Sequence, residues 1–168
     1  MAGGVLLDTS FLITLADKNR AHHEGAWQYG RHFLENEIPI NLSTIVASEF
    51  SIKQEIPPEI LSCCVVLPFN WDDALRAAKL DWKRLHSLGV ARDALKDDIK
   101  IIAQAARADV DLVITDDAQS FYKYCITFKE DGEVRFRAIK LEDGFDRAFF
   151  DPSGQRDFSD DLGAGAES

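Results

Sequence analysis

Short apolar runs alternate with segments of helical periodicity along most of the chain. The runs are short enough for buried parallel strands and cover residues 5–7, 40–42, 64–69 and 111–115. Between and after them, apolar positions recur at near-helical spacing, which predicts helices over residues 11–16, 21–36, 44–53, 71–88, 92–108 and 118–124. This alternation predicts an α/β fold, a three-layer α/β/α sandwich around a mainly parallel central sheet.

The segment after residue 125 has a different pattern. Apolar runs at residues 126–128 and 134–141 flank a charged stretch that contains Asp131 and Gly132. An Asp-Gly pair between two such runs is typical of a β-hairpin. Residues 151–168 are rich in Gly, Ser and Asp, which predicts a disordered acidic tail. We therefore expect one domain over residues 1–150, ending in a hairpin extension, followed by the tail.

Composition limits the class of protein. With 168 residues, 46% of them hydrophobic, the chain can bury one good core. Its three cysteines show neither a zinc-binding spacing nor a disulfide framework, so we expect buried thiols in a reducing cytoplasm. The N-terminal residues have no basic region and nothing near the roughly 20 apolar residues of a membrane span, which favours a cytoplasmic protein without a membrane segment.

The charge balance argues against a broad basic face for nucleic acid. The net charge is −10, from 19 Lys and Arg against 29 Asp and Glu. Such a chain cannot rely on phosphate contacts alone to hold a polyanion. Part of the excess lies in residues 151–168, which hold five acids and one arginine. Another part consists of carboxylates that a bound divalent cation would neutralise.

Three aspartates follow predicted strands directly. Asp8 comes after the strand at residues 5–7, and Asp116 and Asp117 come after the strand that ends at Thr115. The carboxyl ends of parallel strands lie at one edge of a sheet, where the functional crevice of such folds is found. Each aspartate can also simply cap the helix that follows it.

Two further acids interrupt or border apolar helix faces. Glu49 lies between Ala47 and Phe50, close to the buried stripe of its predicted helix. Asp98 lies one turn before Ile101 and Ile102, on or beside the same face, whereas Asp97 points about 100° away and faces water. An acid at such a position usually has a partner or a metal, although a solvated acid at the stripe's border is the alternative.

Four acids that approach one pocket repel each other, and a divalent cation resolves that repulsion. Carboxylate oxygens suit Mg²⁺ or Mn²⁺. No histidine lies within these acidic segments, and we expect the four histidines to lie away from them, which disfavours zinc or a histidine base. Thr9, Ser10 and Thr115 are hydroxyls at the strand ends; they could position water, carboxylate or phosphate, or act as helix caps.

Four motifs in this order resemble those of the PIN-domain nucleases, including VapC-type toxins. The first is Leu6-Leu7-Asp8-Thr9-Ser10, an apolar strand ending in Asp-Thr-Ser. The second runs from Ser43 to Phe50 and contains Glu49. The third is Asp98 followed by an apolar, alanine-containing helix, and the fourth is Ile114-Thr115-Asp116-Asp117 with Phe121. The resemblance covers roughly residues 4–121.

The resemblance implies an Mg²⁺- or Mn²⁺-dependent endoribonuclease that hydrolyses RNA phosphodiester bonds with one or two ions. By motif register Asp8, Glu49, Asp98 and Asp117 form the catalytic set; a shift of one residue would replace Asp117 by Asp116, so both are kept as metal ligands. It also implies a toxin-antitoxin pair, with an antitoxin protein as partner. The residues beyond the fourth motif depart from small PIN toxins, which weakens the toxin assignment more than the nuclease one.

One alternative is a catalytically inactive PIN-like binding module. A haloacid-dehalogenase-type phosphatase is disfavoured, because Ser10 stands where that chemistry needs a second aspartate.

PIN domains often pair through helices, so aromatic residues could form a homodimer surface or belong to the core; these are Trp27, Tyr29, Trp71 and Trp82. Basic residues near the predicted ligands could guide RNA or be solvated; these are Lys53, Arg92, Lys96 and Lys100.

Overall fold

The central element of the computed structural model is a parallel five-stranded sheet; the structure describes residues 3–80 and 92–150. The strand order is β3-β2-β1-β4-β5, and all four neighbouring pairs are parallel. The strands are β1 (Val5–Leu7), β2 (Ile40–Ser43), β3 (Cys64–Leu67), β4 (Leu112–Thr115) and β5 (Arg137–Lys140). The predicted α/β sandwich around a mainly parallel sheet is confirmed.

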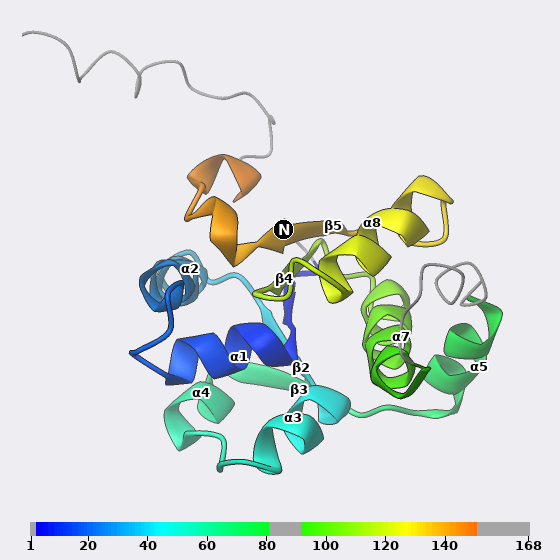
Figure 1. Ribbon diagram of the computed structural model, residues 1–168, viewed down its shortest axis with the longest axis horizontal. Helices are drawn as coiled ribbons and strands as arrows, with labels where there is room; N and C mark the ends of the chain where they lie inside the picture. The colour runs from blue at the N-terminus through cyan, green and yellow to red at the C-terminus, as the bar shows by residue number, and fades with distance from the viewer. Residues whose placement is uncertain (1–2, 81–91, 151–168) are drawn as a thin grey trace, which may run out of the picture.

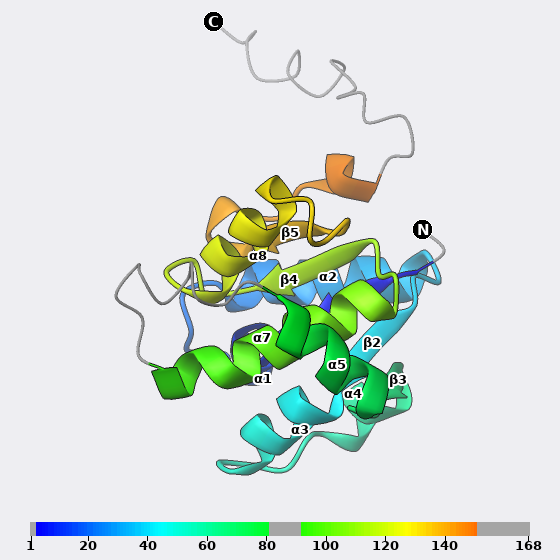
Figure 2. The same ribbon diagram turned by 90° about the vertical axis from the view of Figure 1, so that its right-hand side faces the viewer.

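Helices cover both faces of this sheet. In Figures 1 and 2, α1 and α2 lie on one side and α5 and α7 on the other. The strand order explains this, because the chain moves from β1 to β3 in one direction and then crosses back to β4, and right-handed crossovers place the two sets of helices on opposite faces. The helices are α1 (Thr9–Ala16), α2 (His23–Glu35), α3 (Thr44–Ser51), α4 (Pro58–Ser62), α5 (Trp71–Lys79), α7 (Arg92–Arg107), α8 (Phe121–Glu130) and the short turns η1 (Leu141–Asp143) and η2 (Arg147–Phe150).

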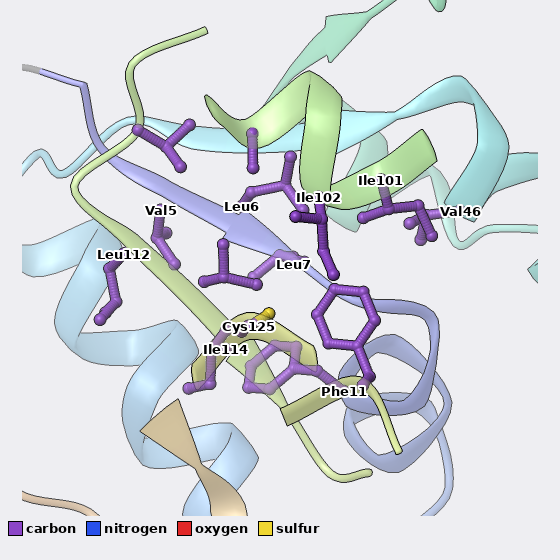
Figure 3. Close-up of a cluster of buried hydrophobic side chains, with 14 of the residues drawn as sticks. Val5, Leu6, Leu7, Phe11, Val46, Ile101, Ile102, Leu112, Ile114 and Cys125 are labelled. Carbon is purple, nitrogen blue, oxygen red and sulfur yellow. The ribbon is translucent and has the colours of Figure 1, made fainter. Parts of the chain in front are cut away.

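The core is built around the middle strand. All three residues of β1 are buried, and in Figure 3 their side chains lie between Phe11 of α1 and residues of α7 such as Ile101 and Ile102. Burying a side chain of this size stabilises the fold by roughly 1.5–3 kcal/mol. The strand is therefore fixed from both faces, and the residue that follows it, Asp8, is held in place.

The predicted β-hairpin at residues 126–141 is wrong. Residues 126–128 belong to α8, and β5 pairs with β4 in parallel. The buried side chains of α8 recur at helical spacing and are Phe121, Tyr124, Cys125 and Phe128. The Asp-Gly pair ends this helix instead of turning a hairpin: Gly132 has a φ of +74°, and the N–H of Glu133 donates to the carbonyl of Phe128 at 2.8 Å.

Several boundaries differ from the expected ones. The helix predicted over residues 71–88 is observed as α5, which ends at Lys79, and residues 81–91 lie outside the described part of the chain, as does the predicted tail at 151–168. Tyr29, for which a dimer surface and the core were the two alternatives, belongs to the core: it is fully buried and donates its hydroxyl to the carbonyl of Gly144 at 3.0 Å. Among the described helices, none is long and apolar enough to cross a membrane.

Candidate active site

A cleft of about 640 Å³ opens at the carboxyl edge of the sheet. Five acids line it. Four of them, here called the cleft acids, are supplied by different segments: Asp8 after β1, Glu49 from α3, Asp98 from α7 and Asp117 after β4. The other lining residues are Thr9, Ser10, Ile13, Ala16, Asp17, Phe50, Lys53 and Gln54. The structure thus brings together four of the five acids singled out in the sequence and leaves Asp116 out of the lining.

Asp8 is the most buried of these acids, with 4% of its surface exposed. It caps α1, a position expected for Thr9 or Ser10, by accepting the N–H of Ser10 at 3.3 Å. The same oxygen accepts the hydroxyls of Ser10 at 2.6 Å and Thr115 at 2.8 Å. Burial raises the pKa of Asp8, and these hydrogen bonds only partly oppose the rise. Capping the helix and lining the cleft are therefore compatible roles.

Glu49 is half-buried and is tied to α1. The Thr9 hydroxyl donates to its carboxylate, which joins the first turn of α1 to α3. Burial raises the pKa of Glu49, the charges of Asp97 and Asp8 raise it further, and the Thr9 hydrogen bond opposes the rise. The acid at the border of the apolar stripe is thus held in the cleft by a neighbouring hydroxyl.

The pKa of Asp98 is strongly raised. Burial, followed by the negative charges of the other cleft acids and Asp97, raises its pKa to about 8. Without a cation, this carboxyl therefore holds a proton at neutral pH. Its neighbour Asp97 behaves differently, as expected: it is 40% exposed and accepts a hydrogen bond from Lys100 at 2.7 Å.

Asp117 shapes the turn between β4 and α8. Its carboxylate accepts the backbone N–H groups of Gln119 at 3.0 Å and Ser120 at 2.9 Å, together with the Ser120 hydroxyl. Burial opposes ionisation of Asp117, but these hydrogen bonds to the charged form prevail and lower its pKa. Asp117 and Asp98 are thus two cleft acids whose pKa values are shifted in opposite directions.

Asp116 is bound away from the cleft. Its carboxylate accepts the Thr14 hydroxyl at 2.6 Å, lies 2.5 Å from Nδ1 of His22 and 3.4 Å from Nη2 of Arg20. The expectation that every histidine lies away from the acidic segments is therefore wrong for His22. Ninety-four positions separate the two residues of this pair, so local sequence patterns gave no signal of it.

The hydroxyls at the strand ends hold the acids in register. Ser10 Oγ and Thr115 Oγ1 lie 2.9 Å apart, and both contact Asp8. Ser10 Oγ also accepts the N–H of Asp116 at 2.8 Å, and Thr115 Oγ1 accepts that of Asp117 at 2.9 Å. Thr9, Ser10 and Thr115 thus position carboxylates and backbone; contact with water or phosphate stays a prediction.

The donor set suits a hard divalent cation. None of the four cleft acids is paired with Lys, Arg or His in the described part of the chain. Their mutual repulsion adds to burial in raising the pKa of Asp98. Within residues 3–80 and 92–150, no three His, Cys, Asp or Glu side chains form a ready-made metal cage. An open set of carboxylates is compatible with Mg²⁺, which keeps several waters and needs only one or two protein carboxylates.

Solved structures share this fold. The VapBC2 structure from Rickettsia felis, bound to a promoter DNA fragment, matches over 81% of this chain and 97% of its own, with 15% identity and a TM-score of 0.53. The VapC20 toxin of Mycobacterium tuberculosis, described as cleaving the sarcin-ricin loop, matches over 71% and 94%, with 16% identity and a TM-score of 0.51. The DNA-bound VapBC of Salmonella typhimurium matches over 82% and 98%, with 17% identity and a TM-score of 0.51.

These likenesses identify the fold, which is the VapC-like PIN fold expected from the four motifs. No protein-family profile matches the sequence. No curated protein matches it either.

Proposed function

We propose that this protein is a divalent-metal-dependent endoribonuclease. The observation that carries the proposal is the meeting of Asp8, Glu49, Asp98 and Asp117 in one cleft, without a paired cation among the described residues. Carboxylates gathered at the carboxyl edge of a parallel sheet are chemically suited to hold Mg²⁺ or Mn²⁺. The VapC-like fold supports RNA as the substrate, since one protein with this fold is described as cleaving the sarcin-ricin loop.

In this mechanism the four acids would hold the metal and the hydroxyls would hold the acids. Asp117 is ionised at neutral pH because hydrogen bonds stabilise its charge, whereas Asp98 has to release a proton when a cation binds. A bound divalent ion would polarise the scissile phosphate and lower the pKa of the attacking water. Thr9 and Ser10 keep Glu49 and Asp8 aimed into the cleft, so the ligands need not reorganise during the reaction.

RNA cleavage by the purified protein tests the proposal. We expect cleavage of single-stranded or structured RNA with Mn²⁺ or Mg²⁺ and none with EDTA. Asp8→Asn should fold and lose about 100-fold or more of the activity, because it removes a ligand charge. Asp72→Asn is the matched control, since Asp72 is exposed on α5 and does not line the cleft. Full activity of Asp8→Asn in a clean preparation would exclude this mechanism.

The alternative is an inactive PIN-like module, and calorimetry separates the two. A nuclease should bind Mn²⁺ at the acidic cleft, and the heat should disappear in Asp8→Asn. An inactive module that does not turn over RNA need not bind the ion at all. Mn²⁺ binding without RNA cleavage under any metal or pH condition would favour the module.

A protein partner is the second part of the proposal. Two of the similar structures are VapBC complexes bound to DNA, which supports a small cytoplasmic antitoxin partner for this chain. An acidic cleft would attract a basic side chain of such a partner and be blocked by it. A small reading frame beside this one should encode a protein that co-purifies with the chain and inhibits RNA cleavage.

A homodimer remains a proposal that rests on exposed aromatic residues. Trp27 is 50% and Trp71 75% exposed, so both are available for a subunit interface. Trp82 lies outside the described residues. Analytical ultracentrifugation of wild type and a Trp71→Ser variant tests the interface: a dimer that persists at equal affinity in the variant would exclude Trp71 from it.

A further inference from the structure

One basic side chain lines the acidic cleft within the described part of the chain. Lys53 lies just beyond α3, where its backbone N–H donates to the carbonyl of Phe50 at 3.2 Å, and Gln54 donates to the same carbonyl at 3.3 Å. This turn fixes the backbone of Lys53 one helical turn after Glu49. The lysine therefore projects from the same wall of the cleft as one of the proposed metal ligands.

The Lys53 ammonium is not used within the described fold. No carboxylate of residues 3–80 or 92–150 lies within 4 Å of it, although five acids line the same cleft. Other lysines do have such partners: Lys100 bonds to Asp97 at 2.7 Å and Lys140 to Glu142 at 2.6 Å. The charge of Lys53 therefore remains available to an anion that enters the cleft.

We propose that Lys53 binds a phosphate of the RNA backbone adjacent to the scissile phosphate. The inference rests on the proposed ribonuclease function and names the substrate class more closely: an oligonucleotide with at least two phosphodiesters. The scissile phosphate would lie at the four acids, and the neighbouring phosphate would reach the lysine. The apolar side chain of Ile13, which is only partly buried, also lines the cleft and gives a base or ribose an uncharged wall.

The overall negative charge makes this contact more important for RNA affinity here than it would be in a basic nuclease. With a net charge of −10, the molecule as a whole repels RNA, so attraction has to come from local cations. Neutralising one phosphate of a single strand changes the slope of log K against log salt by about 0.7. A lysine at a helix end can also act only on the helix dipole, in which case its loss would lower stability and leave RNA binding unchanged.

RNA binding as a function of salt tests the inference. A single-stranded RNA oligonucleotide would be titrated with the full-length chain in Ca²⁺, which suppresses turnover, at several salt concentrations. Lys53→Gln should weaken binding about fivefold at low salt and make the slope shallower by about 0.7, and Lys53→Arg should resemble wild type. Lys79→Gln is the control: it changes net charge equally, and exposed Lys79 lies on α5, across α7 from α1 (Figure 1).

Kinetics separate this contact from the chemistry. Lys53→Gln should raise the KM for the oligonucleotide about fivefold and leave kcat nearly unchanged, and it should not affect Mn²⁺-dependent hydrolysis of bis(p-nitrophenyl) phosphate, which has no second phosphate. If wild type hydrolyses neither substrate, the proposed function fails while the binding comparison still applies. Equal salt slopes for Lys53→Gln and Lys79→Gln, or no RNA binding by wild type, would overturn the inference.

Discussion

Asp117 lines the acidic cleft, whereas the carboxylate of adjacent Asp116 is bound by Thr14 and His22 outside its lining. The two aspartates leave the same strand end, and the backbone turn gives them different partners. Asp117 builds the turn into α8 and Asp116 ties the end of β4 to α1 and the residues that follow it. Asp117 is therefore the proposed metal ligand, and the neighbouring Asp116 is a structural residue.

Isosteric substitutions should separate these two roles. Asp117→Asn should lower RNA cleavage by about 100-fold or more, because it removes a ligand charge. Asp116→Asn should keep most of the activity but lower the free energy of unfolding by about 1–3 kcal/mol, because the contacts of its carboxylate with Thr14 and Arg20 lose their charge. Cleavage assays and urea unfolding of both variants give the comparison, and a loss of activity confined to Asp116→Asn would reverse the assignment.

Thr9 should control metal affinity through Glu49. Thr9→Val keeps the shape of the side chain but removes the hydroxyl that bonds to Glu49. Loss of such an outer hydrogen bond typically costs 10- to 100-fold in metal affinity, so we expect Mn²⁺ binding by calorimetry to weaken by about tenfold. Thr9→Ser should restore it. If Thr9→Val binds Mn²⁺ as tightly as wild type, the hydroxyl does not position a ligand.

The sequence allowed most of this site to be predicted because it is set by regular rules. Asp8 and Thr115 end neighbouring parallel strands, so their placement at one edge follows from topology. Glu49 and Asp98 could be found because each borders an apolar helix face. The contact of His22 with Asp116 could not, since it joins distant segments through loops that carry no periodic pattern.

The hairpin prediction failed because two local signals competed. Asp131 and Gly132 are turn formers between apolar runs, which favours a hairpin, yet the buried residues of α8 repeat at helical spacing. Phe121 and Phe128 pack into the core, which favours the helix. Gly132 then forms the turn that ends this helix. A short-range sequence pattern does not show which of these side chains will be buried by tertiary packing.

Gly4 should be needed for stability but not for the chemistry. It has a φ of +71°, and an added Cβ would collide with the carbonyl oxygen of Pro39. We expect Gly4→Ala to lower the free energy of unfolding by about 1–3 kcal/mol. Gly4 precedes β1, at the end of the strand opposite Asp8, so activity per folded molecule should not change. An unchanged urea midpoint would show that the strand start tolerates a side chain.

The protonation of Asp98 couples stability to pH in the metal-free protein. Its pKa rises from a usual value of 3.8 to about 8 in the fold, so between these values the folded state binds a proton that the unfolded state does not. Stability from this group is therefore fully present below about pH 4 and is lost as pH rises through 8. Burial raises the pKa of Asp8 and Glu49 as well, so these acids act in the same direction.

We therefore expect the Tm measured in EDTA to fall between pH 5 and pH 8. The loss of unfolding free energy that Asp98 contributes should stay below the roughly 1.4 kcal/mol per pH unit that one fully coupled proton allows. Asp98→Asn should flatten this dependence and stabilise the metal-free protein at pH 8, because it removes the repelled charge, while also losing RNA cleavage. Saturating Mn²⁺ should reverse the slope in wild type only, since metal binding displaces the proton more easily at high pH. A wild-type Tm that rises with pH in EDTA would contradict the raised pKa of Asp98.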